Sequence, residues 1–177
     1  MADEETEGTG SLGVAYSRPR AFETIVYGVL AIGVLDFLDA SIFFPLYYGI
    51  TFQSVWWGPA SGLLGREAVR AGGWNTALLG ILLHFVVAFC IATVYFLVSR
   101  YLAAVNRPVI FGLIYGIVAN LVMQNVVIPL SAIGPRTTVE PFGSVLNSFI
   151  GHALLVGLPV ALIANWSARK NARTASA

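Results

Sequence analysis

Four long apolar segments constrain the fold of this 177-residue chain more than any other feature of its sequence. They lie at about residues 22–48, 75–99, 108–132 and 142–166. Each exceeds the ~20 residues that a helix needs to cross the hydrocarbon core of a bilayer. Because lipid leaves an exposed backbone without hydrogen-bond partners, helices are favoured over strands for every crossing. The sequence therefore predicts an all-α, polytopic membrane protein with four transmembrane helices, whose membrane domain covers residues 21–168.

The composition supports a surface that faces lipid. Hydrophobic residues make up 57% of the chain and charged residues 11%, whereas a soluble domain averages roughly 25% charged residues. With so few charges, the chain cannot cover its surface for contact with water. The net charge of +1 also lacks the basic excess that nucleic-acid binding needs. We therefore expect the lipid bilayer as a partner, and no nucleic acid.

The segments outside the spans predict tails, a tight turn and a surface helix. Residues 1–20 are polar and acidic and are expected to form a disordered tail, and residues 169–177 form a basic C-terminal tail. The turn between Arg100 and Arg107 is short, which favours an antiparallel bundle. Residues 52–73 are too polar to span the membrane, so they are expected to form a short interfacial helix.

Three features refine the expectation for this interfacial segment. Trp56 and Trp57 suit the headgroup layer, as does Trp74 just beyond the segment. Pro59 is acceptable in the first turn of a helix, and Gly73 is suited to its end.

The distribution of basic residues predicts the orientation of the spans. With four spans, seven of the ten Lys and Arg residues lie on the side that holds both termini, and three lie on the other side. The positive-inside rule places the richer side in the cytoplasm, so both termini are expected there. The seven are Arg18, Arg20, Arg100, Arg107, Arg169, Lys170 and Arg173, and the three are Arg66, Arg70 and Arg136.

Four ionisable residues lie within the predicted spans, namely Asp36, Asp39, His84 and His152. Such residues are costly in a membrane and are candidates for a functional site. Asp39, His84 and His152 each lie about nine residues, or roughly 14 Å, inside the predicted outer end of a span. They are therefore expected to share one layer. Two acids three residues apart would repel if both were ionised, so one should be neutral or paired with a histidine.

Small and amide residues recur at a spacing of four along the third span, at Gly112, Gly116, Asn120 and Gln124. This spacing places them on one face of a helix. Stripes of this kind let transmembrane helices approach closely and form hydrogen bonds across the interface. Asn120 and Gln124 therefore join the two acids in a predicted polar intramembrane cluster, and packing of the helices is the interpretation that needs the fewest assumptions.

Two alternatives use the same residues for chemistry. His84 and His152, on different helices at one depth, could bind a b-type haem from both sides, in a haem- or quinone-binding electron-transfer component. Asp36 and Asp39 could instead belong to a proton or small-solute pathway formed by an oligomer.

The sequence contains no nucleophile motif, no His-Glu-x-x-His and no glycine-rich phosphate loop, so no enzymatic activity is expected. Cys90 is the only cysteine, which excludes a metal site built from a cysteine cluster of this chain.

Several short runs resemble a family of small, uncharacterised bacterial inner-membrane proteins. The runs are Gln53-Ser54, Ala60-Ser61-Gly62-Leu63-Leu64-Gly65, Gly72-Gly73, Leu79-Gly80, His84-Phe85, Tyr115-Gly116 and Val127-Ile128-Pro129-Leu130-Ser131-Ala132. The likeness covers most of residues 28–163 and includes Asp36. It implies a four-helix protein of the bacterial inner membrane and supplies no activity.

The sequence departs from that family in two places. Residues 120–125 are richer in amides than the family pattern, and Trp56-Trp57 is also unusual. We expect these features to serve something particular to this protein, such as a partner protein. The sequence thus favours a non-catalytic binding or accessory component of a membrane complex, associated with other membrane subunits or with itself.

Overall fold

The computed structural model describes residues 18–101, 103–135 and 137–175, which form helices and the turns between them. No strand occurs in these ranges, so the prediction of an all-α fold is confirmed. The expected N-terminal tail lies outside the described residues except for residues 18–20, which have no regular secondary structure.

Four helical stretches are long and apolar enough to cross a membrane, which confirms the predicted number and is the pattern of a multi-pass membrane protein. The first two are α1 (Ala21–Tyr48) and α3 (Arg66–Tyr101). The third consists of α4 (Pro108–Val122), the π-helical turn η2 (Met123–Val127) and α5 (Ile128–Leu130). The fourth consists of α6 (Phe142–Gly151), the π-helical turn η3 (His152–Gly157) and α7 (Leu158–Ala175).

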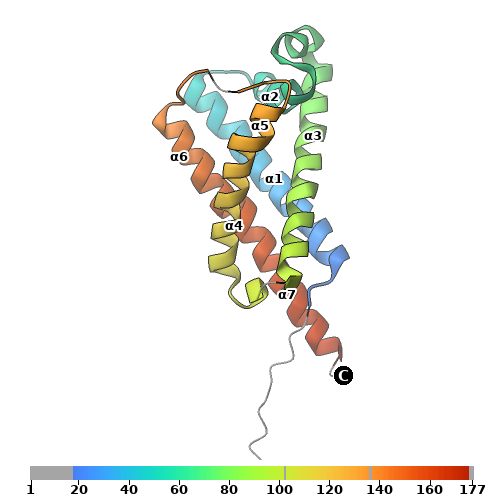
Figure 1. Ribbon diagram of the computed structural model, residues 1–177. Coiled ribbons are helices and arrows are strands. Elements are labelled where there is room, and N and C mark those ends of the chain that lie inside the picture. The colour runs from blue at the N-terminus through green and yellow to red at the C-terminus, as the bar shows by residue number, and fades with distance from the viewer. Residues whose placement is uncertain (1–17, 102, 136, 176–177) are drawn as a thin grey trace, which may run out of the picture.

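The chain passes back and forth between two ends of the molecule (Figure 1). It rises through α1, continues through α2 (Phe52–Leu64) at the upper end, and descends through α3. A short 3-10 helix, η1 (Ala103–Asn106), turns it upward again into α4, and α6 and α7 bring it down to the C-terminus. We call the end that holds α2 and α5 the upper end, and the end that holds the C-terminus the lower end.

The segment expected as one surface helix over residues 52–73 consists of two helical pieces. Thr51 caps the first piece, since its side chain accepts a hydrogen bond from the backbone N–H of Ser54. Because α2 begins right after this cap, Pro59 lies inside the helix. We had expected it in the first turn of a helix. Gly65, at a φ of 81°, ends α2, and Gly73, at a φ of 56°, introduces the kink in α3.

The backbones of α2 and α3 are in direct contact at Gly80. A Cβ atom added there would lie 1.7 Å from the carbonyl oxygen of Trp56, so only glycine fits. Trp56 is 1% exposed and stacks on Phe37 with ring centroids 4.5 Å apart. Trp57 donates a hydrogen bond from Nε1 to the carbonyl oxygen of Gly73 at 2.9 Å. The expectation that Trp56 anchors the chain among headgroups is therefore wrong, because its ring packs inside the protein.

Small residues hold the lower half of the molecule together. A Cβ at Gly116 would lie 2.1 Å from the carbonyl oxygen of His152, and one at Gly157 would lie 2.1 Å from that of Gly112. The third and fourth spans are thus in backbone contact. The neighbouring core contains the buried residues Ile32, Ala88, Ala92, Tyr95, Val156, Val160, Ala161 and Ala164.

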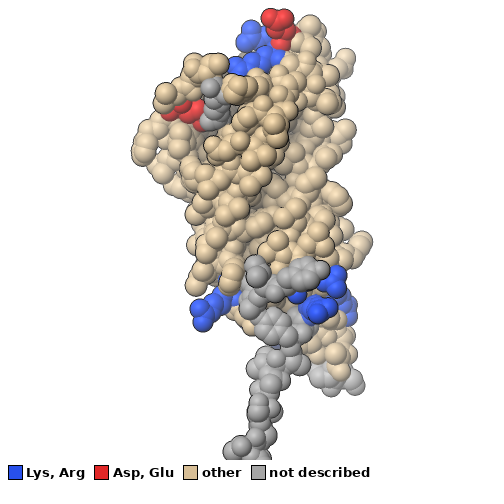
Figure 2. Space-filling view, viewed as in Figure 1, with Lys and Arg blue, Asp and Glu red and all other residues tan. Residues whose placement is uncertain are grey.

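The fourth span is longer than predicted, because α7 continues to Ala175. Most of the expected basic tail over residues 169–177 is therefore helical. Polar contacts tie this extension to the start of α1. Glu23 accepts hydrogen bonds from Ser167 at 2.9 Å and from Lys170 at 2.5 Å, and the backbone N–H of Arg20 donates to Ser167 at 2.9 Å. Figure 2 shows the charged residues of the visible face gathered at the two ends, with an uncharged belt between them.

Candidate functional site

A layer of polar side chains crosses the middle of the molecule and begins between α3 and α1. The Nε2 atom of His84 lies 2.9 Å from the carbonyl oxygen of Gly33. Because a carbonyl only accepts hydrogen bonds, Nε2 must carry the proton and donate. The other ring nitrogen, Nδ1, lies 3.8 Å from Asp36 Oδ2. The predicted pairing of an acid with a histidine is thus present in the geometry, and the acid concerned is Asp36.

The His84 ring sits among aromatic side chains. Its centroid lies 5.2 Å from that of Trp56 in an edge-to-face arrangement, and 5.4 Å from that of Phe85. Phe37 is a third neighbour, at 6.4 Å. The side chain of His84 is 11% exposed. These contacts fix the imidazole on the side of α1 that faces α2 and α3.

The layer continues from α1 to the fourth span through Asp39. Asn147 donates a hydrogen bond from Nδ2 to Asp39 Oδ2 at 2.9 Å. Gly151 lies beside the same carboxylate, since a Cβ there would be 3.4 Å from Oδ2. His152 and Asp36 are close enough to Asp39 to interact with it electrostatically. Asp39 therefore accepts a hydrogen bond from an amide of the fourth span and interacts electrostatically with an imidazole of the same span.

Ser148 carries the layer from the fourth span to the third. Its hydroxyl donates to Asn120 Oδ1 at 2.6 Å and accepts from Gln124 Nε2 at 3.2 Å. His152 Nδ1 lies 3.0 Å from the backbone carbonyl oxygen of Ser148, so this nitrogen donates within its own helix. Asn120 is fully buried, and its Nδ2 atom has no hydrogen-bond partner among the described residues.

Both π-helical turns of the described chain coincide with this layer. Gln124 lies in η2, and His152 begins η3. A π-helical turn widens a helix by one residue and often occurs at functional sites. The sequence analysis did not predict either turn.

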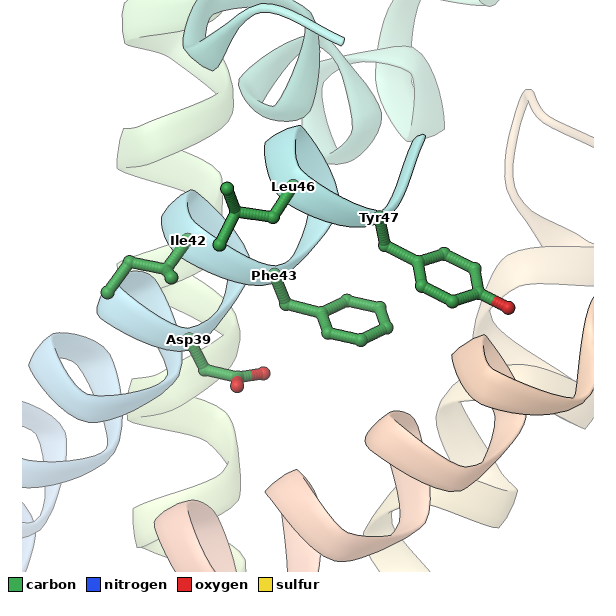
Figure 3. Close-up of a pocket in the computed structure, with 5 residues that line it drawn as sticks. All are labelled: Asp39, Ile42, Phe43, Leu46 and Tyr47. Atoms are coloured by element: carbon green, nitrogen blue, oxygen red, sulfur yellow. The ribbon is translucent and has the colours of Figure 1, made fainter. Parts of the chain in front are cut away.

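A hollow of about 440 Å³ lies on α1 between Asp39 and the upper end. It is lined by Asp39, Ile42, Phe43, Leu46 and Tyr47, which share one face of the helix. In Figure 3 the side chains of Asp39, Phe43 and Tyr47 point toward α6. The rings of Phe43 and Tyr47 are stacked with centroids 5.0 Å apart. Ile42 is 57% exposed and Leu46 is 82% exposed, so this rim of the hollow is open.

The hollow ends near the level of Asp39. Just beyond this level, the carbonyl oxygen of His152 occupies the space beside Gly116, and further down Gly112 and Gly157 bring the same two spans into backbone contact. At the upper rim, α6 touches Tyr47 through Gly143, where an added Cβ would lie 2.7 Å from the phenolic oxygen. The hollow, called the recess below, is thus an open depression on α1 with the Asp39 carboxylate at its lower end.

The structure joins most of the predicted site residues, but in two groups. His84 pairs with Asp36, whereas His152 belongs with Asp39, Asn120 and Gln124. No hydrogen bond or ion pair joins the two histidines within the described part of the chain. Those ranges also hold no group of three or more His, Cys, Asp or Glu residues that could bind a metal ion.

The sequence analysis missed two hydrogen-bonding partners. Asn147 belongs to the same helix face as Ser144, Ser148 and Gly151, so the polar stripe itself could have identified it. The backbone carbonyl of Gly33 carries no residue signature and could not have been identified.

Comparisons of the chain with protein-family models, with curated proteins and with solved structures found no match. What the protein does is therefore inferred from its own residues.

Proposed function

We propose that the protein is a non-catalytic binding or accessory component of the bacterial inner membrane. In this proposal the four spans form an antiparallel bundle with both termini in the cytoplasm, and α2 lies at the outer membrane surface. The observation that carries the proposal is the recess above Asp39, which opens in the upper half of the molecule and ends at a carboxylate. A recess of this form suits a bound molecule or a partner chain.

The distribution of charge supports this orientation. The described basic residues of the lower end are Arg18, Arg20, Arg100, Arg107, Arg169, Lys170 and Arg173, and those of the upper end are Arg66 and Arg70. Figure 2 displays this division on one face. The positive-inside rule then assigns the lower end to the cytoplasm.

The layout of polar groups favours binding over conduction. A proton or solute pathway needs polar groups or water spread along the membrane normal. The hydrogen bonds of the polar layer instead run sideways, from α3 through α1 and α6 to α4. Below the layer, Gly112, Gly116 and Gly157 hold the third and fourth spans in backbone contact. These contacts leave no space for a path between those two spans.

The histidine contacts favour a role without haem. A haem held by two histidines needs a free nitrogen on each ring and room for the macrocycle between them. His84 Nε2 donates to Gly33, and the remaining nitrogen faces Asp36. The backbone contact of His152 with Gly116 further restricts the space beside that ring.

Cysteine labelling in intact cells tests the orientation. In a variant in which Cys90 is replaced, single cysteines at Ser11 and Thr174 should resist an impermeant thiol reagent, and one at Ala71 should react. Labelling at Ser11 and Thr174 with none at Ala71 would reverse the proposed orientation. Permeabilised cells provide the control, since all three sites should then react.

Purification from native membranes without overexpression tests the binding role. We expect a membrane subunit or an extractable small molecule to co-purify in a fixed ratio with the wild-type chain. Leu46→Trp should fill the recess and reduce that ratio, because Leu46 lines it and is largely exposed. Leu38→Trp is the matched control, since Leu38 is also exposed on α1 but does not line the recess. A Soret band abolished by His84→Ala or His152→Ala would contradict the proposal, as would co-purification that Leu46→Trp leaves unchanged.

A further inference from the structure

We infer, on the premise that the recess is a binding site, that it accepts a hydrophobic organic cation with Asp39 as the counter-ion. Three features of the recess are used: a carboxylate at its lower end, an aromatic wall, and an open aliphatic rim. Each feature restricts the chemistry of the bound molecule in a different way.

Among the described residues, no lysine or arginine lies at the depth of Asp39 to balance its charge. Its hydrogen-bond donor, Asn147, is a neutral amide. All described Lys and Arg residues lie at the two ends of the molecule. His152 interacts with Asp39 electrostatically, and its Nδ1 proton is donated to the carbonyl of Ser148. A carboxylate removed from water is favourable only when it is paired, so a cation entering the recess would supply the missing charge.

The aromatic wall also favours a cation. Phe43 and Tyr47 lie stacked on the same side of α1 as the Asp39 carboxylate (Figure 3). The face of an aromatic ring attracts a cation within about 6 Å of its centroid. A positively charged group between these rings and Asp39 would therefore be attracted from two directions.

The rim and the volume restrict the size and polarity of the cation. The recess holds about 440 Å³, which falls in the range of roughly 300–1,000 Å³ that is usual for small-molecule sites. Ile42 and Leu46 present an aliphatic rim that is exposed in the isolated chain and that would face lipid in the membrane. A small, strongly hydrated ion would lose its water here without replacement. An organic cation whose charge is spread over apolar groups meets both requirements.

Binding of tetraphenylphosphonium to the purified full-length protein in lipid nanodiscs tests the inference by equilibrium dialysis. We expect saturable binding of one cation per chain. Asp39→Asn keeps the size of the side chain and an oxygen that can accept from Asn147, and should weaken binding at least about tenfold. Glu67→Gln is the matched control, because Glu67 is an exposed acid on α3 that does not line the recess. It should change affinity less than twofold. Tetraphenylborate, with the same shape and the opposite charge, should not bind saturably.

Phe43→Leu provides a second variant that keeps an apolar side chain and removes the ring, and it should weaken binding several-fold. If Asp39→Asn does not fold, the affinity of Phe43→Leu for tetraphenylphosphonium tests the inference instead. The inference would be overturned by equal affinity in the wild type and Asp39→Asn, by an equal loss in Glu67→Gln, or by an unchanged affinity in Phe43→Leu. In one outcome, tetraphenylphosphonium does not bind, but a membrane subunit still co-purifies and Leu46→Trp reduces its amount. This outcome would overturn the proposed cation and leave the proposed binding role intact.

Discussion

Replacement of Gly116 by alanine should destabilise the protein through a single contact between two spans. The added Cβ would lie 2.1 Å from the carbonyl oxygen of His152 and 2.7 Å from the Cα of Ala153. Both atoms belong to backbone, so no change of rotamer can relieve the overlap. The third span must instead move away from η3 by roughly 1 Å, and a gap of that size forfeits a quarter to a half of each dispersion contact.

The expected loss can be estimated from opposing effects. Overpacking costs about 1–3 kcal/mol, and we take the upper value because only backbone atoms can move here. Alanine in place of glycine inside a helix returns up to about 1 kcal/mol. The free energy of unfolding of Gly116→Ala should therefore fall by about 2 kcal/mol. Gly62→Ala is the control, because its Cβ would meet Ser131 at an ordinary distance of 3.7 Å. It should leave stability unchanged or raise it by less than about 1 kcal/mol.

Unfolding in mixed micelles of a mild detergent and dodecyl sulfate, followed by far-ultraviolet circular dichroism, measures the effect. Both variants should keep the helicity of the wild type before the transition. The midpoint of Gly116→Ala should shift to a lower fraction of dodecyl sulfate, and that of Gly62→Ala should not. A Gly116→Ala protein as stable as the wild type would refute the backbone contact between the third and fourth spans.

Two further predictions concern the polar contacts. His84→Gln should keep the fold and lower the free energy of unfolding by roughly 1–2 kcal/mol, the scale of one hydrogen bond in a membrane, and the same titration checks it; unchanged stability would contradict a bond to Gly33. The single variants Glu23→Gln and Lys170→Gln should each lower the melting temperature, and the double variant should lower it by less than the sum, because the two side chains contact each other at 2.5 Å. Calorimetric scans at low and high salt measure this coupling, which salt should weaken; additive effects would refute it.

The existence of the four spans could be predicted because lipid acts on every residue of a span in the same way. Hydropathy sums over about 20 positions, so single polar residues such as Asp36 and Asp39 did not hide the first span. The ends were harder to predict. α7 continues past Trp166 because Ser167 and Lys170 find Glu23 of α1 as a partner, and a contact between opposite ends of the chain leaves no local signal.

Which helices are in contact was harder to predict from the sequence than which small residues share one face of a helix. The stripe at Gly112 and Gly116 did mark a close approach, as expected. Gly80 also marked one, but its neighbour is α2 and not another span. Hydropathy cannot distinguish these cases, since an apolar surface helix and a transmembrane helix present the same side chains. Trp56, whose carbonyl makes this contact, is also buried, so its indole ring lies inside the protein.

The placement of small and large residues along α1 explains why Asp39, and not Asp36, ends the recess. In the lower half, a Cβ at Gly28 would lie 3.1 Å from the nearest side-chain carbon of α3, so α1 fits tightly against its neighbours. In the upper half, α1 carries large rings, and Tyr47 meets α6 only where a glycine makes room. Asp39 lies at the boundary between the tightly packed lower half of α1 and its more open upper half. Asp36, one turn lower, faces the imidazole of His84 and has a partner within the chain. Asp39 lies where the packing opens and where no described lysine or arginine reaches it, so of the two acids in the middle of α1 it is the one placed to take an external partner.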